Sequence, residues 1–463
     1  MEIKVKNLGV LKQAEFTLGD LTIICGGNNS GKTYATYALF GFLDNWDSFV
    51  SIEISSASIE QLLAKGVVKV DFQQYVKNID MIIADACSKY SQKIDEVFAA
   101  PEERFNETEF HMSLDTRNIR LTEQFESTAS SATNKEFLSI VKNVGSSELI
   151  ITLLAFQDNI EIPTHIIAHF ISEAIKNIIF QRNLPRPFIV SAERTGAVTF
   201  RKELNFSRNR LLERMTQAHS DMDRIQILFK GYKDYPLPVK KNVDFTRNLE
   251  SIFKKNSFIT EHHPDILTDF ADIIGGEYMV NREDELYYIP KQGKRIKLSM
   301  DSSSSAVRSL LDIGFYLRHE AQKGDLLMVD EPELNLHPEN QRRIARLFAR
   351  LINIGIKVFI TTHSDYIVKE LNTLIMLNHD RPHLKQLAED EGYLPAELLS
   401  ADRIKVYIAE EALVKVDGKT RKVKVPTLTE AKIDSERGIE ARSFDKTIDD
   451  MNRIQDAIVW GGE

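Results

Sequence analysis

The stretch Ile23-Ile24-Cys25-Gly26-Gly27-Asn28-Asn29-Ser30-Gly31-Lys32-Thr33 contains a glycine, four residues, and then Gly-Lys-Thr. An apolar run precedes it, and a helical pattern from Thr33 to Leu43 follows. Strand, glycine-rich loop and helix in this order are typical of a phosphate-binding loop, because glycines let backbone N–H groups turn toward phosphate oxygens. We expect Lys32 to reach the β- and γ-phosphates and Thr33 to hold Mg²⁺ through its hydroxyl. The predicted phosphate-binding residues are Gly26, Asn28, Asn29, Ser30, Gly31, Lys32 and Thr33.

Composition narrows the class of protein. The chain has 463 residues, of which 43% are hydrophobic and 27% charged, as in ordinary soluble globular proteins. A net charge of -9 excludes a global basic field for nucleic acid, although a local basic patch stays open. Two cysteines offer no disulfide framework, the N-terminus lacks the apolar core of a signal peptide, and no apolar run is long enough to span a bilayer. We therefore expect a cytoplasmic protein without a membrane partner.

Residues 51–183 have a mostly helical pattern, within which residues 101–135 are polar and predict a long loop or an exposed insertion. His165 and His169 lie one helical turn apart, a spacing that suits a metal ion. No third ligand is evident nearby in the sequence, so we favour a helix-surface or core role for both.

A second central strand is predicted from Pro187 to Ala192, with Glu193 and Arg194 at its end. Ligands of open α/β sheets usually lie at the carboxyl ends of strands. Two interpretations stay equally open at this point: Arg194 contacts phosphate, or Glu193 and Arg194 are solvated loop charges.

The stretch from Phe200 to Tyr232 is charged, helical in pattern and rich in arginine. It could form an arm that meets a partner or nucleic acid, but a solvated helix face is the commoner explanation. Its arginines are Arg201, Arg208, Arg210 and Arg214.

Three strand-like segments after residue 276 lead into Asp301-Ser302-Ser303-Ser304-Ser305. Serines at the start of a helix are first of all an N-cap signature. Hydroxyls and free N–H groups at that position also form an anion site, so Ser303, Ser304 and Ser305 are candidates for phosphate contact.

An apolar strand ends in the acid pair Asp330-Glu331. An aspartate at such a strand end can hold Mg²⁺, and a second carboxylate beside it can deprotonate the attacking water. A helix follows from Gln341 to Ile354, and its row Arg342, Arg346 and Arg350 favours a solvated face. The next strand ends at His363, whose imidazole is suited to contact a γ-phosphate and sense its loss.

These motifs, in their order and spacing, resemble those of the ABC-type ATPases. The branch they are similar to includes the SMC, Rad and RecF ATPases and the OLD-like ATPases of bacterial defence islands. Glu331-Pro332-Glu333-Leu334-Asn335-Leu336-His337-Pro338 and Thr361-Thr362-His363-Ser364 look especially like the OLD-like group. The resemblance covers residues 1–43 and 188–377.

The resemblance implies an α/β fold: an ABC-type P-loop ATPase core with a helical insertion and a small C-terminal α/β cap. It implies ATP and Mg²⁺ as ligands, with Lys32 and Thr33 at the phosphates and Mg²⁺, Asp330 at Mg²⁺, Glu331 activating water, and His363 as the switch histidine. The serine segment would meet ATP bound to another subunit. It departs from the usual Ser-Gly-Gly form, because Ser303-Ser304-Ser305 contains no glycine.

The resemblance also divides the chain. The predicted parts are an N-terminal ATPase lobe (1–50), a mainly helical insertion (51–183), a core strand and loop (184–200), a helical arm (201–275), an ATPase core (276–380) and a C-terminal cap (381–463). The tail contains no Asp-x-Asp and is too short for the nuclease domain that some OLD-like proteins carry.

The functional expectation is an ATP-hydrolysing sensor or scaffold subunit, at least a dimer, that controls a separate effector protein. The ATPase subunits of the two-gene PARIS and Septu anti-phage systems are the relatives it resembles, and a phage protein or DNA would be the trigger. Two alternatives stay open. One is a RecF-like or SMC-like DNA-repair ATPase that clamps duplex DNA, and the other is a non-hydrolysing module in which ATP only joins subunits.

Overall fold

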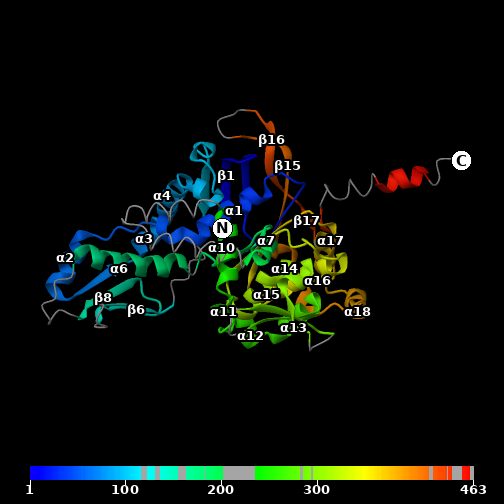
Figure 1. Ribbon diagram of the computed structural model, residues 1–463. Coiled ribbons are helices and arrows are strands. Elements are labelled where there is room, and N and C mark those ends of the chain that lie inside the picture. The colour runs from blue at the N-terminus through cyan, green and yellow to red at the C-terminus, as the bar shows by residue number, and fades with distance from the viewer. Residues whose placement is uncertain are drawn as a thin grey trace, which may run out of the picture. The chain divides into compact units, whose positions relative to one another are not determined.

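The computed structural model describes residues 1–115, 123–130, 136–154, 163–181, 183–201, 235–281, 285–292, 296–416, 421–434, 436–440 and 451–458 (Figure 1). The chain divides into two compact units. The first comprises residues 1–3, 42–92 and 110–186, and the second residues 4–41, 93–109 and 187–463. No helix among these described ranges is both long enough and apolar enough to cross a membrane.

The second unit is built on a six-stranded sheet with the order β16-β15-β3-β14-β13-β9. Strands β9, β13, β14, β3 and β15 run parallel, and β16 pairs antiparallel with β15. Strands β3 and β13 are buried along their whole length, which explains their unbroken apolar sequences. The strands are β3 (Leu21–Cys25), β9 (Pro187–Val190), β13 (Leu326–Asp330), β14 (Lys357–Thr362), β15 (Ile404–Val414) and β16 (Val423–Glu430).

This sheet confirms the predicted α/β class with a P-loop ATPase core. The parallel register aligns Asp330 with Thr361 and Ile24 with Thr361, so β13, β14 and β3 end at one edge. The glycine-rich loop, which follows β3, therefore lies at the same edge of the sheet as the acid pair and His363.

Two strands of the predicted cap, residues 381–463, belong to the central sheet. Strand β15 pairs in parallel with β3, and the hairpin partner β16 extends the same sheet. The tail belongs to the second compact unit together with the ATPase core. The sequence of β15 mixes apolar and polar residues, so it gives no sign of a central position in the sheet.

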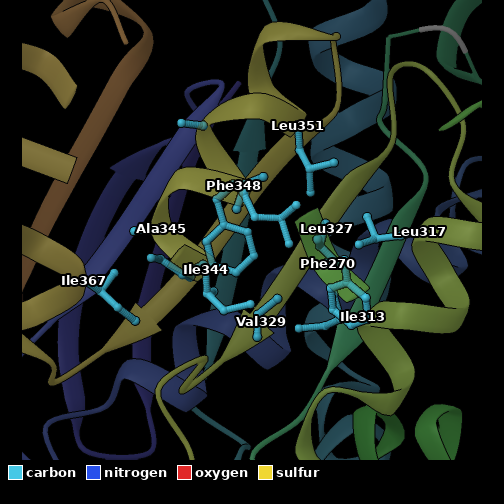
Figure 2. Close-up of a cluster of buried hydrophobic side chains, with 14 of the residues drawn as sticks. Phe270, Ile313, Leu317, Leu327, Val329, Ile344, Ala345, Phe348, Leu351 and Ile367 are labelled. Carbon is cyan, nitrogen blue, oxygen red and sulfur yellow. The ribbon is translucent and has the colours of Figure 1, made fainter. Parts of the chain in front are cut away.

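Helix α16 (Pro338–Asn353) shows how sequence produces the core. His337 caps its first turn by accepting a hydrogen bond from the N–H of Glu339, and Pro338 occupies the first helical position, where a missing N–H is harmless. Apolar residues recur on one face and pack with neighbours from other elements (Figure 2). Labelled members of this cluster are Phe270, Ile313, Leu317, Leu327, Val329, Ile344, Ala345, Phe348, Leu351 and Ile367.

The prediction of a solvated face for the arginine row of α16 is wrong for Arg346 and Arg350, whereas Arg342 is 44% exposed and pairs with Glu370 at 2.7 Å. Arg346 donates to Glu397 Oε2 at 2.8 Å and lies 4.6 Å over the ring of Tyr393. Arg350 is only 8% exposed and pairs with Asp265 and Asp269 of α13 (Pro264–Ile274). These arginines join helices and loops, which is a structural role.

The remaining elements of the second unit are helices and short strands, and β10, β11 and β12 form a small antiparallel sheet. The helices are α1 (Lys32–Phe49, its first half), α5 (Ile94–Phe98), α7 (Arg194–Thr199), α10 (Leu237–Arg247), α11 (Leu249–Ile252), α12 (Phe258–His262), α14 (Ser305–Ser309), α15 (Leu311–Phe315), α17 (Asp365–Met376) and α18 (Pro382–Asp390). The strands are β1 (Glu2–Leu8), β2 (Leu11–Thr17), β10 (Gly276–Val280), β11 (Leu286–Pro290), β12 (Leu298–Ser299), β17 (Ile433–Asp434) and β18 (Gly438–Ile439).

Within the predicted helical arm, residues 235–275 form helices of the second unit. Arg208, Arg210 and Arg214 lie outside the described residues, as does most of the stretch to which they belong.

The first unit contains the insertion, which is less helical than predicted. Strands β4, β8, β7 and β6 form an antiparallel sheet, and α6 carries both His165 and His169. The sequence pattern did not reveal these strands, because each is a short run of alternating apolar and polar residues between polar segments. The elements are α2 (Ser56–Lys65), β4 (Val67–Asp71), α3 (Gln73–Lys77), α4 (Ile79–Ser91), β5 (Glu109–Ser113), β6 (Phe125–Ser130), β7 (Glu136–Lys142), β8 (Glu148–Leu153) and α6 (Thr164–Lys176).

Candidate active site

Four loops meet at the carboxyl edge of the central sheet, because β3, β9, β13 and β14 run parallel. The loop after β3 is the glycine-rich loop, and the loop after β13 begins with Glu331. His363 follows β14, and Glu193 and Arg194 follow β9. This edge is where ligands of open α/β sheets bind.

Two glycines of the phosphate loop are required by the backbone. Gly26 has φ +148°, and a Cβ there would lie 2.7 Å from the carbonyl oxygen of Ala409. Gly31 has φ +98°, and its Cβ would lie 2.6 Å from Leu11. Both conformations disfavour any residue with a side chain, so the sequence spacing follows from the loop geometry.

Lys32 begins α1, and its ammonium group is folded back over the loop. Its Nζ donates to the carbonyl oxygens of Gly26 at 2.9 Å and Gly27 at 2.8 Å. The helix start adds its partial positive charge at the same place. A buried cation within a glycine loop fits the binding of nucleotide phosphates.

Asp330 lies between two threonine hydroxyls. Thr33 Oγ1 donates to one carboxylate oxygen at 3.2 Å, and Thr361 Oγ1 donates to the other. The pKa of Asp330 is raised to about 6: burial is the largest cause, the charge of Glu331 contributes to the rise, and the two hydroxyls limit it. A carboxylate next to the P-loop hydroxyl is the oxygen pair that Mg²⁺ prefers, and such sites need only one or two carboxylates from the protein.

Glu331 adopts a left-handed backbone, with φ +53°, that is unusual for a residue with a Cβ. Its N–H donates to the carbonyl oxygen of Thr361 at 3.1 Å, and its own carbonyl accepts from Leu334 N at 3.1 Å and from Arg194. Such a conformation costs about 1–3 kcal/mol and persists where the surroundings hold it. Its side chain is 27% exposed and lines an open cavity of about 610 Å³ together with His363.

Glu333 is a site residue that the sequence interpretation did not assign. Its Oε1 accepts from the N–H of His363 at 2.8 Å and from Thr362 Oγ1 at 2.9 Å. Its Oε2 is buried and has no hydrogen-bond partner within the described part of the chain. His363 Nδ1 lies 3.5 Å from Glu333 and 3.6 Å from Glu331. Glu333 thus joins the loop after β13 to the loop after β14, and its position two residues after Glu331 was the available signal.

The sequence model of the family described as AAA ATPase domain matches residues 1–368. The chain belongs to this family. No curated protein matches the chain.

Several solved structures are similar to this AAA ATPase domain chain in fold alone. An Smc head bound to the C-winged helix domain of ScpA is 12% identical over 92% of this chain and 97% of that chain, with a TM-score of 0.31. A Pyrococcus furiosus Smc head with an extended coiled coil, bound to the C-terminal domain of ScpA, is 13% identical over 98% of both chains, with a TM-score of 0.31. The SMC head domain from Thermotoga maritima is 10% identical over 93% of this chain and 98% of that chain, with a TM-score of 0.29.

Both interpretations of Arg194 are wrong. The side chain is 1% exposed, so it is neither a solvated loop charge nor open to phosphate. Its guanidinium donates to four backbone carbonyls, of Ser191, Ser309, Asp330 and Glu331. Sequence alone could not show this, because the four carbonyls come from segments far apart in the chain.

Asp312 supplies a carboxylate near this buried cation. It is 1% exposed; its Oδ2 has no hydrogen-bond partner among the described residues, and Thr246 donates to its Oδ1 at 3.5 Å. Burial raises the pKa of Asp312 to about 7, and Arg194 and Thr246 limit the rise.

The serine segment caps a helix as predicted. Ser304 Oγ accepts from the N–H of Val307 at 3.3 Å, and Ser303 Oγ donates to the carbonyl of Met300 at 2.7 Å. Ser304 and Ser305 are exposed. The hydrogen bonds of Ser303, Ser304 and Ser305 stay within residues 300–308.

Across the described part of the chain, no group of three or more His, Cys, Asp and Glu side chains is arranged to hold a metal ion. Thr33 and Asp330 bring one hydroxyl and one carboxylate together, which suits a hydrated Mg²⁺ that takes few ligands from the protein.

The first prediction concerns the phosphate loop. Lys32→Ala should weaken ATP binding by about 100-fold or more, because charge-assisted hydrogen bonds contribute about 1.5–3 kcal/mol each. Isothermal titration with ATP measures this. Lys369→Ala, at an exposed lysine on α17, is the matched control and should bind ATP as the parent does. Parental affinity in Lys32→Ala would show that the loop is not the nucleotide site.

The second prediction concerns pH. Because the pKa of Asp312 is about 7 in the folded protein and near 3.8 when unfolded, the folded state keeps a proton that the unfolded chain releases between pH 4 and 7. The free energy of unfolding therefore falls through this group as pH rises over that window, by up to about 1.4 kcal/mol per pH unit. Asp312→Asn removes the titration.

Urea unfolding of the parent and of Asp312→Asn at pH 5, 6, 7 and 8 measures this difference. The stability of the variant relative to the parent should rise from pH 5 to 7 and then level off. A difference that is constant over the whole range would contradict the raised pKa.

Proposed function

We propose that the chain is an ABC-type ATPase that binds ATP with Mg²⁺ between two copies of itself and hydrolyses the γ-phosphate. Its role is that of a sensor or scaffold subunit in anti-phage defence, controlling a separate effector protein. The observation that carries the ATPase proposal is the meeting of the phosphate loop, Asp330, Glu331 and His363 at one edge of the sheet.

Each residue has a task that its position supports. Lys32 and the loop N–H groups would neutralise phosphate charge. Thr33 and Asp330 would hold Mg²⁺, which when bound would supply positive charge against the phosphates. The Glu331 carboxylate accepts the proton of the attacking water, and His363 contacts the γ-phosphate. Glu333 fixes the backbone of His363, so the imidazole is held beside Glu331.

The composite arrangement draws support from the exposure of Ser304 and Ser305. Ser304 Oγ accepts from the N–H of Val307 and Ser305 Oγ accepts from Arg308, and both residues stay exposed. In the ABC-type ATPases that the motifs resemble, this segment meets ATP held by the other subunit. The working unit is therefore at least a dimer.

The biological role draws support from the sequence resemblance to the ATPase subunits of two-gene anti-phage systems. Two alternative functions compete with this role: a repair ATPase that clamps duplex DNA, and an assembly module that does not hydrolyse ATP. The first would bind duplex DNA with steep salt dependence, and the second would bind ATP without turnover.

The third prediction tests the composite site. Glu331→Gln keeps the shape of the carboxylate but removes its basicity, so turnover should fall by about 100-fold or more while ATP binding remains. Binding that needs the γ-phosphate stabilises the assembled state by mass action. Light scattering should therefore show a larger assembly of Glu331→Gln with ATP than with ADP.

Ser304→Arg is the control for that assembly, because it adds bulk at the exposed serine segment. In the Glu331→Gln background it should remove the difference between ATP and ADP without reducing ATP binding by single subunits. In the otherwise parental protein it should reduce turnover. Equal masses in all nucleotide states, with turnover insensitive to Ser304→Arg, would contradict the composite site.

The fourth prediction concerns the partner. Expressed from its native operon, the tagged chain should copurify with a stoichiometric second protein. The identity of that protein, by mass spectrometry, and loss of phage protection on its deletion would test the sensor role. Tight, salt-dependent binding to duplex DNA with no stoichiometric protein partner would favour the repair ATPase instead.

A further inference from the structure

We infer that Arg194 is a positioning residue that couples the serine segment to Glu331, the proposed catalytic base. The inference rests on the proposed ATPase function, since it assigns the link between the two halves of that site. Arg194 does not touch nucleotide; it acts through the backbone carbonyls that it holds.

The contacts join three elements. Arg194 Nε donates to the carbonyl of Ser309, the last residue of α14, at 2.7 Å. One terminal nitrogen donates to the carbonyls of Ser191 at 3.0 Å and Asp330 at 2.8 Å, and the other donates to that of Glu331 at 2.8 Å. A single guanidinium therefore spans the ends of β9, β13 and the helix that the serine segment begins.

The carbonyl of Glu331 is the critical contact. Glu331 has a left-handed backbone, and its carbonyl direction depends on that conformation. The hydrogen bond from Arg194, together with the hydrogen bonds from Glu331 N to Thr361, fixes both peptide groups of the residue. Fixing them sets the direction of the Glu331 side chain toward the cavity shared with His363.

The Nε end of the Arg194 guanidinium is linked to the serine segment through the carbonyl of Ser309. Helix α14 runs from Ser305 to Ser309, directly after the Ser304 cap, so a shift of the exposed serines moves the carbonyl of Ser309. The guanidinium is planar and rigid, so a shift at Nε is carried to its terminal nitrogens. Docking of the serine segment on a second subunit would thus shift the backbone of Glu331.

Burial makes the link strong. The guanidinium is screened from water, and its charge is balanced at a distance by carboxylates including Asp312, Asp330 and Glu333. Hydrogen bonds of a charged donor in a low-dielectric interior are stronger than neutral ones. A lysine could not replace it, because the three nitrogens of the guanidinium donate to four carbonyls around its edge, whereas a lysine has a single nitrogen.

The test uses Arg194→Lys in the full-length protein. Turnover per folded molecule should fall by about 10- to 100-fold, as expected when a catalytic group is misplaced by about an ångström. ATP affinity should stay within about threefold of the parent, because the contacts of Lys32 do not involve Arg194. Loss of turnover in parallel with loss of ATP binding and of melting temperature would show a merely structural role and overturn the inference.

Arg350→Lys is the matched control. Arg350 is also buried and also joins two helices, through Asp265 and Asp269, but away from the catalytic edge. It should lower the melting temperature while turnover per folded molecule stays near parental. An equal loss of turnover in both lysine variants would overturn the special role of Arg194.

Coupling itself is measured by a double-mutant cycle. Ser304→Arg should reduce turnover in the parent but have little further effect in Arg194→Lys, because the link is already broken. Additive losses in the double variant would show that Ser304 and Arg194 act independently, and that coupling is absent.

Hydrogen exchange separates failure of this inference from failure of the proposed function. With a non-hydrolysable ATP analogue bound, Ser304→Arg should speed exchange of the amides at residues 331–336 in the parent, but not in Arg194→Lys. A parent without ATP turnover would refute the ATPase proposal, and the exchange result would still decide the coupling. Unchanged exchange at residues 331–336 in Arg194→Lys relative to the parent would overturn it.

Discussion

The parallel pairing of β3, β14 and β13 is the constraint on which the catalytic edge depends. In parallel strands the carboxyl ends lie together, so the glycine-rich loop, Asp330 and His363 meet although they come from distant parts of the sequence. The same register places Thr361 beside Asp330, and its hydroxyl donates to the carboxylate. The strand register that defines the sheet therefore also positions the groups of the site. A shift in the pairing of β3, β14 and β13 would separate them.

The candidate site also depends on two buried side chains that connect its loops. Glu333 joins the loops after β13 and β14 through the N–H of His363, and Arg194 joins β9, β13 and α14 through carbonyls. Both side chains are buried. Glu333 has a carboxylate oxygen with no hydrogen-bond partner among the described residues, and the Arg194 guanidinium is removed from water, and both conditions cost free energy in a buried position. Buried polar links of this kind hold reacting groups in place because breaking one contact leaves an uncompensated group in a dry interior.

Electrostatics around Asp330 favour a cation at the same point. Burial and the neighbouring Glu331 raise the pKa of Asp330, so its charge is unfavourable until positive charge arrives. Lys32 brings a positive charge to the phosphate loop, where its ammonium is held by the loop carbonyls. The membership of the chain in the AAA ATPase domain family agrees with a site that gathers phosphates and a divalent ion.

The sequence by itself determined the local chemistry: the glycine spacing of the phosphate loop, the acid pair after an apolar strand, the capped helix at Ser304 and the α/β class. These follow from short-range patterns, in which backbone geometry and side-chain type act within a few residues. Only the tertiary structure decided that Arg194 is buried, that Glu333 holds His363 and that β15 completes the central sheet. The reason is physical: those roles depend on partners from distant segments, and a charged side chain has the same sequence signal whether it is solvated or buried against carbonyls.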